Sequence, residues 1–342
     1  IAPVISTQNV TNISTSSATG NGNFLSLGTP NASQYGVCWN TTGNPSIANN
    51  KTQQGIPSGT GSFTSNITGL TPNTTYYVKT YATYVSGTVY GEEVNFTTYQ
   101  LPSLTTQAAS FINATSATAS GAITVVGNPT PSQYGFCWNT TGLPTINDYK
   151  TENGSTNTAE GYGSILTGLT PNTTYYLRAY ATNSAGTAYG NEVSFKTTLF
   201  DGSGTQDEPY LIQTLTDLTQ LANNSTYWDK YFLQIADIDA SQTSTWNSGA
   251  GWNPIGNSTI KFTGSYDGQY HKITGLNINR GSSNQGLFGY INGATIKNLG
   301  ITNANINVYG DLNQQVGALV GYSLNNSCIE NTLFFSKSTR IS

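Results

Sequence analysis

The stretch LTPNTTYYVKTYAT at residues 70–83 recurs as LTPNTTYYLRAYAT at 169–182, and this repetition decides the fold of the first half of the chain. Two further blocks, at 33–47 and 87–98, also recur 99 residues downstream. The matches keep one order and need no insertion, so a whole domain has been duplicated. The sequence therefore predicts two tandem domains of the same fold.

Within the repeated unit, apolar and polar residues alternate along short segments that are separated by turn residues. In the strand at 76–83, alternate residues beginning with Tyr76 are expected to face the core. The residues between them are expected to face outward, and they are Tyr77, Lys79, Tyr81 and Thr83. A period of two that is repeatedly broken by turns is typical of a two-sheet sandwich. We therefore predict an all-β fold with Ig-like sandwiches at 1–99 and 100–199.

A tyrosine corner precedes the alternating strand in both copies. The signature is Leu70-x-Pro72-x-Thr74-x-Tyr76 in the first copy, and it ends at Tyr175 in the second. The hydroxyl of such a tyrosine bonds back to the backbone just upstream, so both tyrosines are predicted to be structural. This signature, present twice in register, resembles the fibronectin type III family in its Tyr- and Thr-rich bacterial surface form. The resemblance covers nearly all of both copies and implies a spacer or adhesion role without catalysis.

One departure from that family is a Cys-Trp pair on the middle strand, at Cys38-Trp39 and Cys137-Trp138. The two cysteines occupy one position in two separate domains, so they are not expected to pair with each other. With Cys328, they form neither a disulfide framework nor a metal motif. We predict buried free thiols and core tryptophans.

The composition excludes several classes of function. Only 8% of the residues are charged, compared with about 25% in ordinary proteins. The net charge is −4, and 36% of the residues are hydrophobic, so the chain has the material for packed cores. Its 12 Lys and Arg residues are scattered, which argues against nucleic acid as a partner. No run of apolar residues is long enough to predict a membrane span.

The chain contains no Met, not even at position 1. We interpret this as the loss of a secretory signal peptide, which predicts an extracellular protein. The resemblance to bacterial surface proteins further implies the bacterial cell surface. The alternative interpretation is a partial sequence.

The repeat pattern changes after residue 200. GLFGYI at 286–291 matches ALVGYS at 318–323, an offset of 32. Three related apolar segments begin at residues 273, 296 and 329, with spacings of 23 and 33. Short strands with Gly and Asn turns at such spacings predict the rungs of a β-solenoid, in which Asn side chains hydrogen-bond between rungs.

This segment resembles the GLUG-motif surface repeats of bacteria, which are similar to pectate-lyase-like right-handed β-helices. The match covers about 201–332 and is carried by glycine motifs such as GLFG. We therefore assign 200–342 to a short right-handed β-solenoid. One short helix is expected within it, at 214–222, with Thr214 or Thr216 as the N-cap.

Carboxylates in the solenoid are the candidates for a metal site. Asp237 and Asp239 alternate along one predicted strand, and calcium takes oxygen ligands of this kind. The alternative interpretation is that both are outward-facing strand and turn residues. His271 is the single histidine and is expected to be structural. We predict no catalytic residue and no cofactor other than this calcium.

Two kinds of residue suggest contact with sugars. Trp246 and Trp252, in a loop of Gly, Asn and Ser, are expected to be exposed and are candidates for stacking on sugars. Sequons of the type Asn-x-Ser/Thr are candidates for glycan attachment, and they include Asn40, Asn73, Asn139, Asn172 and Asn257. In a chain rich in Asn and Thr, chance occurrence is the alternative.

These features predict a non-enzymatic structural or adhesive surface subunit. The glycine-rich rungs give way to LFFSKSTRIS, so the solenoid is expected to present an open strand edge. Strand edges that pair between copies would assemble such subunits head to tail into a filament. The alternative is a polysaccharide-binding or polysaccharide-lyase-like β-helix with fibronectin type III spacers, which requires a groove holding several carboxylates and a Lys or Arg near Asp237.

Overall fold

The computed structural model describes residues 1–310 and 315–341, and the fold is all-β, as predicted. The chain divides into two compact units. The first contains most of the two sandwiches. The second contains Asn113–Ser116, Gly168–Thr173 and the residues from Thr197 onward, and its described strands from Tyr210 onward form a β-solenoid of about three turns.

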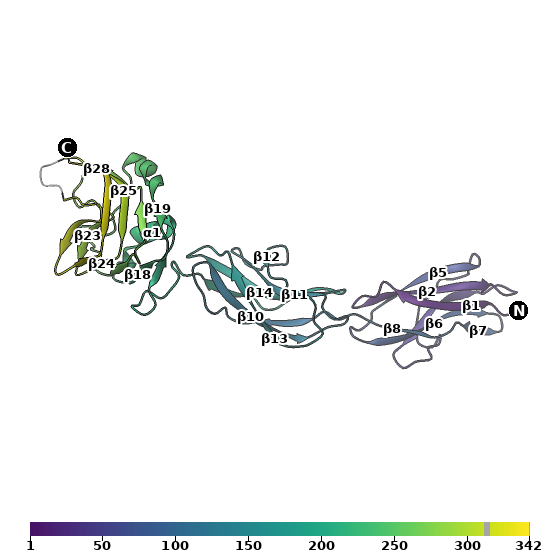
Figure 1. The fold of residues 1–342 in the computed structure, drawn as a ribbon. Coiled ribbons are helices and arrows are strands. Elements are labelled where there is room, and N and C mark those ends of the chain that lie inside the picture. The colour runs from purple at the N-terminus through teal and green to yellow at the C-terminus, as the bar shows by residue number, and fades with distance from the viewer. Residues whose placement is uncertain (311–314, 342) are drawn as a thin grey trace. The chain divides into compact units, whose positions relative to one another are not determined.

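The first sandwich consists of two antiparallel sheets (Figure 1). One sheet has the order β1-β2-β5 and is formed by Val4–Thr11, Ser17–Ser26 and Gly61–Thr68. The other has the order β4-β3-β6-β7 and is formed by Asn50–Lys51, Gln34–Asn40, Thr75–Tyr84 and Gly87–Tyr90, with β8 (Val94–Thr97) also pairing with β6. The repeated stretch at 70–83 contains the tyrosine corner and most of β6, the strand at the centre of this sheet.

The second sandwich repeats this topology strand for strand. Its smaller sheet has the order β9-β10-β13 and is formed by Ser103–Thr106, Ser116–Val125 and Gly161–Thr167. Its larger sheet has the order β12-β11-β14-β15 and is formed by Tyr149–Lys150, Gln133–Asn139, Thr174–Asn183 and Gly186–Tyr189, with β16 (Val193–Lys196) also pairing with β14. The duplication in sequence is therefore a duplication of fold.

The core of each sandwich lies between its two sheets and includes the predicted tryptophan. Trp39 is 8% exposed and Trp138 is 7% exposed. The ring of Tyr76 is buried and stacks on Phe96 with 5.9 Å between centroids, and its hydroxyl accepts a 3.0 Å hydrogen bond from the backbone N–H of Thr71. This bond fixes the turn that leads into β6, because it satisfies a backbone donor that the turn leaves unpaired.

One residue on the outer face of the larger sheet is buried, which the alternation did not predict. Tyr81 was expected to face solvent but is 1% exposed, and it contacts the segment after β4, which pairs with the edge of β3 through Thr52 and Gln54. The hydroxyl of Tyr81 donates to the carbonyl of Thr52 at 2.6 Å, and the N–H of Val37 donates to the Thr52 hydroxyl at 3.0 Å. Gly36 makes this approach possible, since a Cβ there would clash with the Thr52 carbonyl.

The second sandwich contains the same contact. Tyr180 donates to the carbonyl of Thr151 at 2.7 Å, and the N–H of Phe136 donates to the Thr151 hydroxyl at 2.9 Å. A Cβ at Gly135 would clash with the Thr151 carbonyl. The repeated sequence Tyr-Gly-x-Cys-Trp is therefore explained by a strand that is buried on both faces.

The solenoid consists of three parallel sheets that surround one apolar core. The first sheet has the order β17-β18-β20-β24-β27 and is formed by Tyr210–Ile212, Tyr231–Gln234, Ser265–Asp267, Thr295–Lys297 and Cys328–Glu330. The second contains β19 (Ile238–Asp239), β21 (Lys272–Thr274), β22 (Asn277–Arg280), β25 (Gly300–Val308) and β28 (Leu333–Ile341). The third pairs β23 (Phe288–Asn292) with β26 (Val320–Leu324).

Two of the three predicted repeat offsets are the observed strand registers. Phe288 pairs with Val320 at the offset of 32, and Ile296 pairs with Ile329 at the offset of 33. The offset of 23 between Ile273 and Ile296 is wrong, because Ile273 pairs with Ile301 in a different sheet. The partner of Ile296 on the preceding rung is Tyr266, and the sequence around Tyr266 does not resemble the apolar segment that begins at residue 273.

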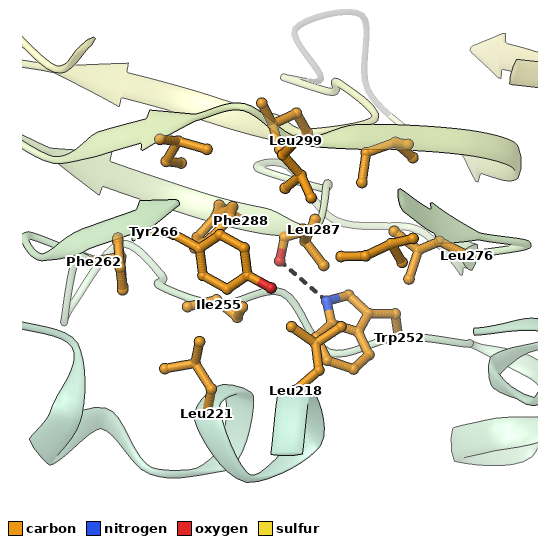
Figure 2. Packing of buried hydrophobic residues seen from close by; sticks show 14 of the residues in the cluster. Leu218, Leu221, Trp252, Ile255, Phe262, Tyr266, Leu276, Leu287, Phe288 and Leu299 are labelled. Carbon is orange, nitrogen blue, oxygen red and sulfur yellow. Dashed lines mark hydrogen bonds between the residues drawn. The ribbon is translucent and has the colours of Figure 1, made fainter. Parts of the chain in front are cut away.

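One end of the solenoid core is closed by the predicted helix, α1 (Leu215–Asn223). Its N-cap is Thr214, which forms a capping box with Asp217. Leu218 and Leu221 point from the helix into the core, where Figure 2 shows them below Ile255 and Trp252. Two 3-10 segments follow, η1 (Ser225–Tyr227) and η2 (Ser241–Gly249).

Asparagine side chains connect successive rungs, as the sequence predicted. Four amide-to-amide hydrogen bonds of 2.8 to 3.2 Å run between neighbouring turns, and the pairs are Asn277–Asn305, Asn279–Asn307, Asn292–Asn325 and Asn298–Asn331. These bonds need no charge, which explains how a solenoid forms in a chain with so few charged residues.

We predict that Gly135→Ala destabilises the second sandwich by about 1–3 kcal/mol, because the added Cβ overpacks the contact with Thr151. Hydrogen exchange is the suitable measurement, since a chain of several domains does not unfold in one step. The amides of β11 and β12 should exchange faster than in the native protein.

Gly59→Ala is the matched control, because nothing lies within 4 Å of a Cβ at this glycine. It should leave exchange in its own sandwich nearly unchanged. Equal protection of β11 in the native protein and the Gly135→Ala variant would contradict the proposed role of the glycine.

Candidate functional site

The two tryptophans expected to be exposed have different environments. Trp252 is 1% exposed, and its indole N–H donates to the carbonyl of Leu287 at 3.1 Å (Figure 2), so the expectation for this residue is wrong. Trp246 is partly exposed, and its ring centroid lies 6.3 Å from that of Trp252. The buried tryptophan thus supports the exposed one from the core side.

Two hollows share Trp246 and Thr219 and lie between α1 and η2. The first has a volume of about 290 Å³ and is lined by Thr219, Ala222, Asn223, Trp246, Asn247, Trp252 and Asn253. The second has a volume of about 400 Å³ and is lined by Thr214, Leu215, Thr216, Thr219, Gln220, Asp239, Gln242 and Trp246. We call the two hollows together the Trp246 groove.

The loop that carries Trp246 is held in place by hydrogen bonds on both sides. The N–H of Gly251 donates to the Trp246 carbonyl at 3.0 Å, and the side chain of Asn247 donates to the Gly251 carbonyl at 2.7 Å. Thr243 is fully buried beneath the loop, where its hydroxyl accepts a 2.9 Å bond from the N–H of Asn277. Asn247 has a positive φ of 52°, a conformation that Asn tolerates.

The lining of the Trp246 groove is nearly free of charge. Amide and hydroxyl side chains dominate it, and Asp239 is its one ionisable side chain. The carboxylate of Asp239 accepts a 2.9 Å bond from the N–H of Ser241, and hydrogen bonding by Ser241 lowers the pKa of this carboxyl. The groove therefore offers neutral hydrogen-bonding groups around one aromatic face.

Asp237, the other proposed calcium ligand, lies at a turn. Its carboxylate accepts a 2.9 Å bond from the N–H of Lys272 and lies 3.2 Å from Nδ1 of His271. The backbone bond from Lys272 is the main cause that lowers the pKa of Asp237. Within residues 1–310 and 315–341, no three His, Cys, Asp or Glu side chains form a group that could hold a metal ion. The calcium site stays a prediction.

A third hollow, of about 150 Å³, lies along the first solenoid sheet and contains Asp267 and Lys297. The Lys297 ammonium and the Asp267 carboxylate lie 3.3 Å apart and form an ion pair. Asn298 also donates to Asp267, at 2.9 Å. The Asp267 carboxylate therefore bonds to two side chains of the neighbouring rung and links the two rungs.

The predicted glycan-attachment residues fall into two groups. Asn40 and Asn139 are partly buried, and their amide groups donate to the carbonyls of Gly43 and Gly142 at 3.0 and 3.2 Å. The remaining three are exposed turn residues, and they are Asn73, Asn172 and Asn257. The second group is therefore the more accessible to modification.

The three cysteines differ in reactivity. Cys38 and Cys137 are fully buried, and burial raises the pKa of Cys38 to about 11 and that of Cys137 to about 12. Cys328 is partly exposed, and a hydrogen bond to Glu330 raises the pKa of this thiol. A thiolate is the reactive form, so the two sandwich cysteines are chemically inert.

No protein-family model matches the chain. It is 38% identical over 130 residues to halomucin of Haloquadratum walsbyi, a match that covers 36% of this chain and 1% of halomucin. It is 38% identical over 124 residues to a protein of Evansella cellulosilytica named "Putative Gly-rich membrane protein", covering 35% of this chain and 14% of that protein. The chain thus spans a small part of either relative. The crystal structure of chicken CNTN1 FN1-FN3 domains aligns with 57% of this chain and 68% of its own, at 16% identity and a TM-score of 0.31.

We predict that a maleimide near neutral pH labels the native protein at one cysteine, Cys328, because the other two thiols are buried and protonated. In denaturant all three should react. Mass spectrometry of the labelled peptides is the measurement, and Cys328→Ser should abolish labelling of the folded protein. Labelling of Cys38 at the same rate as Cys328 would contradict the burial of the middle strand.

Proposed function

We propose that the chain is a non-enzymatic segment of an extracellular surface protein with a structural or adhesive role. The observation that carries this proposal is the architecture, in which duplicated sandwiches and a parallel solenoid are both stabilised by repeated neutral contacts. One relative is named a membrane protein and another a halomucin, and both names fit the cell surface. No helix in the described part of the chain has the length and apolarity needed to cross a membrane.

We also propose that the solenoid is built from repeats of the bacterial GLUG-motif type. The two glycine motifs that suggested it lie at the paired strands β23 and β26. Gly286 and Gly321 each pack against backbone of the other strand's rung, and a Cβ at either position would crowd that backbone. The motif glycines thus serve close rung stacking, as expected of a surface repeat.

The polysaccharide-lyase alternative has less support than polysaccharide binding. Such a lyase needs several convergent carboxylates and a base. Of the three hollows described, one contains Asp239, one contains Asp267 and the third contains no carboxylate. His271 contacts Asp237 at a turn outside these linings. An exposed tryptophan among amides, by contrast, suits a neutral ligand.

We further propose that the subunit self-associates through the rung formed by β27 and β28. Ile329 and Phe334 are 42% and 44% exposed, although the residues that pair with them, Ile296 and Ile301, are buried. In the isolated 342-residue chain, an additional parallel strand from a second copy would cover these apolar side chains and pair with this rung.

The opposite end of the solenoid is already occupied. The N–H of Leu211 in β17 donates to the carbonyl of Asp201, and α1 closes the core there. Two solenoids are therefore not expected to stack head to tail. The strand that adds to β27 and β28 comes either from the same edge of a second copy or from another part of that copy.

We predict concentration-dependent association of the purified chain, which Ile329→Asp combined with Phe334→Asp should abolish by placing charges on the proposed contact. Sedimentation velocity and electron microscopy would measure it. Ile260→Asp is the matched control, because Ile260 is also an exposed apolar residue of the solenoid, at 46%, outside this rung. Monomers at every concentration would exclude the self-association and leave the surface role intact.

A further inference from the structure

We propose that the Trp246 groove is a binding site for a neutral glycan, with one pyranose ring stacked on the indole of Trp246. This inference concerns what the segment binds, and it does not depend on self-association. It is carried by the position of Trp246, the rigidity of its loop and the chemistry of the lining.

Trp246 is unusual among the tryptophans of this chain. The other four are at most 8% exposed, and they are Trp39, Trp138, Trp228 and Trp252. Trp246 instead is half-buried and is a lining residue of both hollows. A large aromatic surface left accessible in a concave site is typical of a ligand-binding position.

The groove is formed before any ligand arrives. Trp252 packs behind Trp246 and is itself fixed by its bond to Leu287, while buried Thr243 ties the loop to Asn277. On the opposite wall, the capping box at Thr214 fixes the start of α1. A site held in this way loses little conformational entropy on binding.

The lining matches the surface of a neutral sugar. A pyranose has an apolar C–H face that stacks on an aromatic ring, and its hydroxyl groups both donate and accept hydrogen bonds. Asn223 and Gln242 have exposed amide side chains, one in each hollow, that can do the same. An aromatic ring bordered by such groups is the arrangement that orients a small polar ligand.

The charge and the volume of the groove restrict the class of ligand that it can bind. Asp239 is the one charged side chain of the lining, and no Lys or Arg is among the lining residues. The nearby Arg280 guanidinium donates to the side-chain oxygen of the lining residue Asn253 at 2.5 Å. Volumes of about 290 and 400 Å³ lie at the lower end of the roughly 300–1,000 Å³ of ligand sites. The geometry points to a short stretch of uncharged polysaccharide that passes over Trp246 and places a sugar on each side of it.

The test is calorimetric titration of the full chain with neutral oligosaccharides (gluco-, manno- and galacto-hexaoses) and with oligogalacturonate as the acidic probe. At least one neutral probe should bind, and Trp246→Ala should weaken it by about tenfold or more, the equivalent of about 1.4 kcal/mol for a lost stacking contact. Trp246→Phe should retain part of the affinity. Tyr270→Ala is the control, because Tyr270 is an exposed aromatic residue outside the groove, and it should bind like the native protein.

A second variant distinguishes a loss of binding from a folding defect, which the replacement of the partly buried Trp246 could also cause. Asn223→Ala combined with Gln242→Ala removes two exposed side chains, so it should weaken binding without changing the circular dichroism melting curve. The proposal is overturned if no neutral probe binds, if binding survives Trp246→Ala, or if the acidic probe binds more tightly than the neutral ones.

Discussion

Each rung of the solenoid buries its inward apolar side chains against the rung before and the rung after it, and this requirement shapes the whole second unit. A terminal rung has only one such neighbour, so its inward face needs another cover. At the N-terminal end, Leu218 and Leu221 of α1 provide it. The wall that α1 presents on its other side, together with η2, forms the Trp246 groove. The candidate binding site is thus a consequence of closing the core.

Much of the fold could be predicted because the chain repeats itself. A 99-residue duplication and a tyrosine corner identify a sandwich without any knowledge of long-range contacts. The helix at α1 was equally predictable, since Thr214 and Asp217 form a local capping box. Local patterns of this kind act within a few residues, so the sequence displays them directly.

The features that could not be predicted depend on what covers a residue. Tyr81 has the alternation of an outward-facing residue, yet the Thr52 segment buries it, and alternation assumes that only one face is covered. Trp246 and Trp252 lie in one loop with similar neighbours in sequence. Trp252 is the buried one because it packs into the solenoid core, where it bonds to Leu287, 35 residues away. The candidate groove could be suspected from sequence, but its aromatic wall could not be assigned to the right residue.

The scarcity of charge links the stability of this chain to its proposed role. The ion pairs found among the described residues are at least partly exposed, and such pairs contribute only about 0–1 kcal/mol each. Stability must therefore come from apolar cores and from neutral bonds such as Asn277–Asn305 and Tyr180–Thr151. Because salt screens charges and not neutral hydrogen bonds, these contacts persist at high ionic strength. The same neutral amide and hydroxyl groups line the hollows beside the half-buried Trp246, so the chemistry that stabilises the fold is also the chemistry on which the proposed glycan site depends.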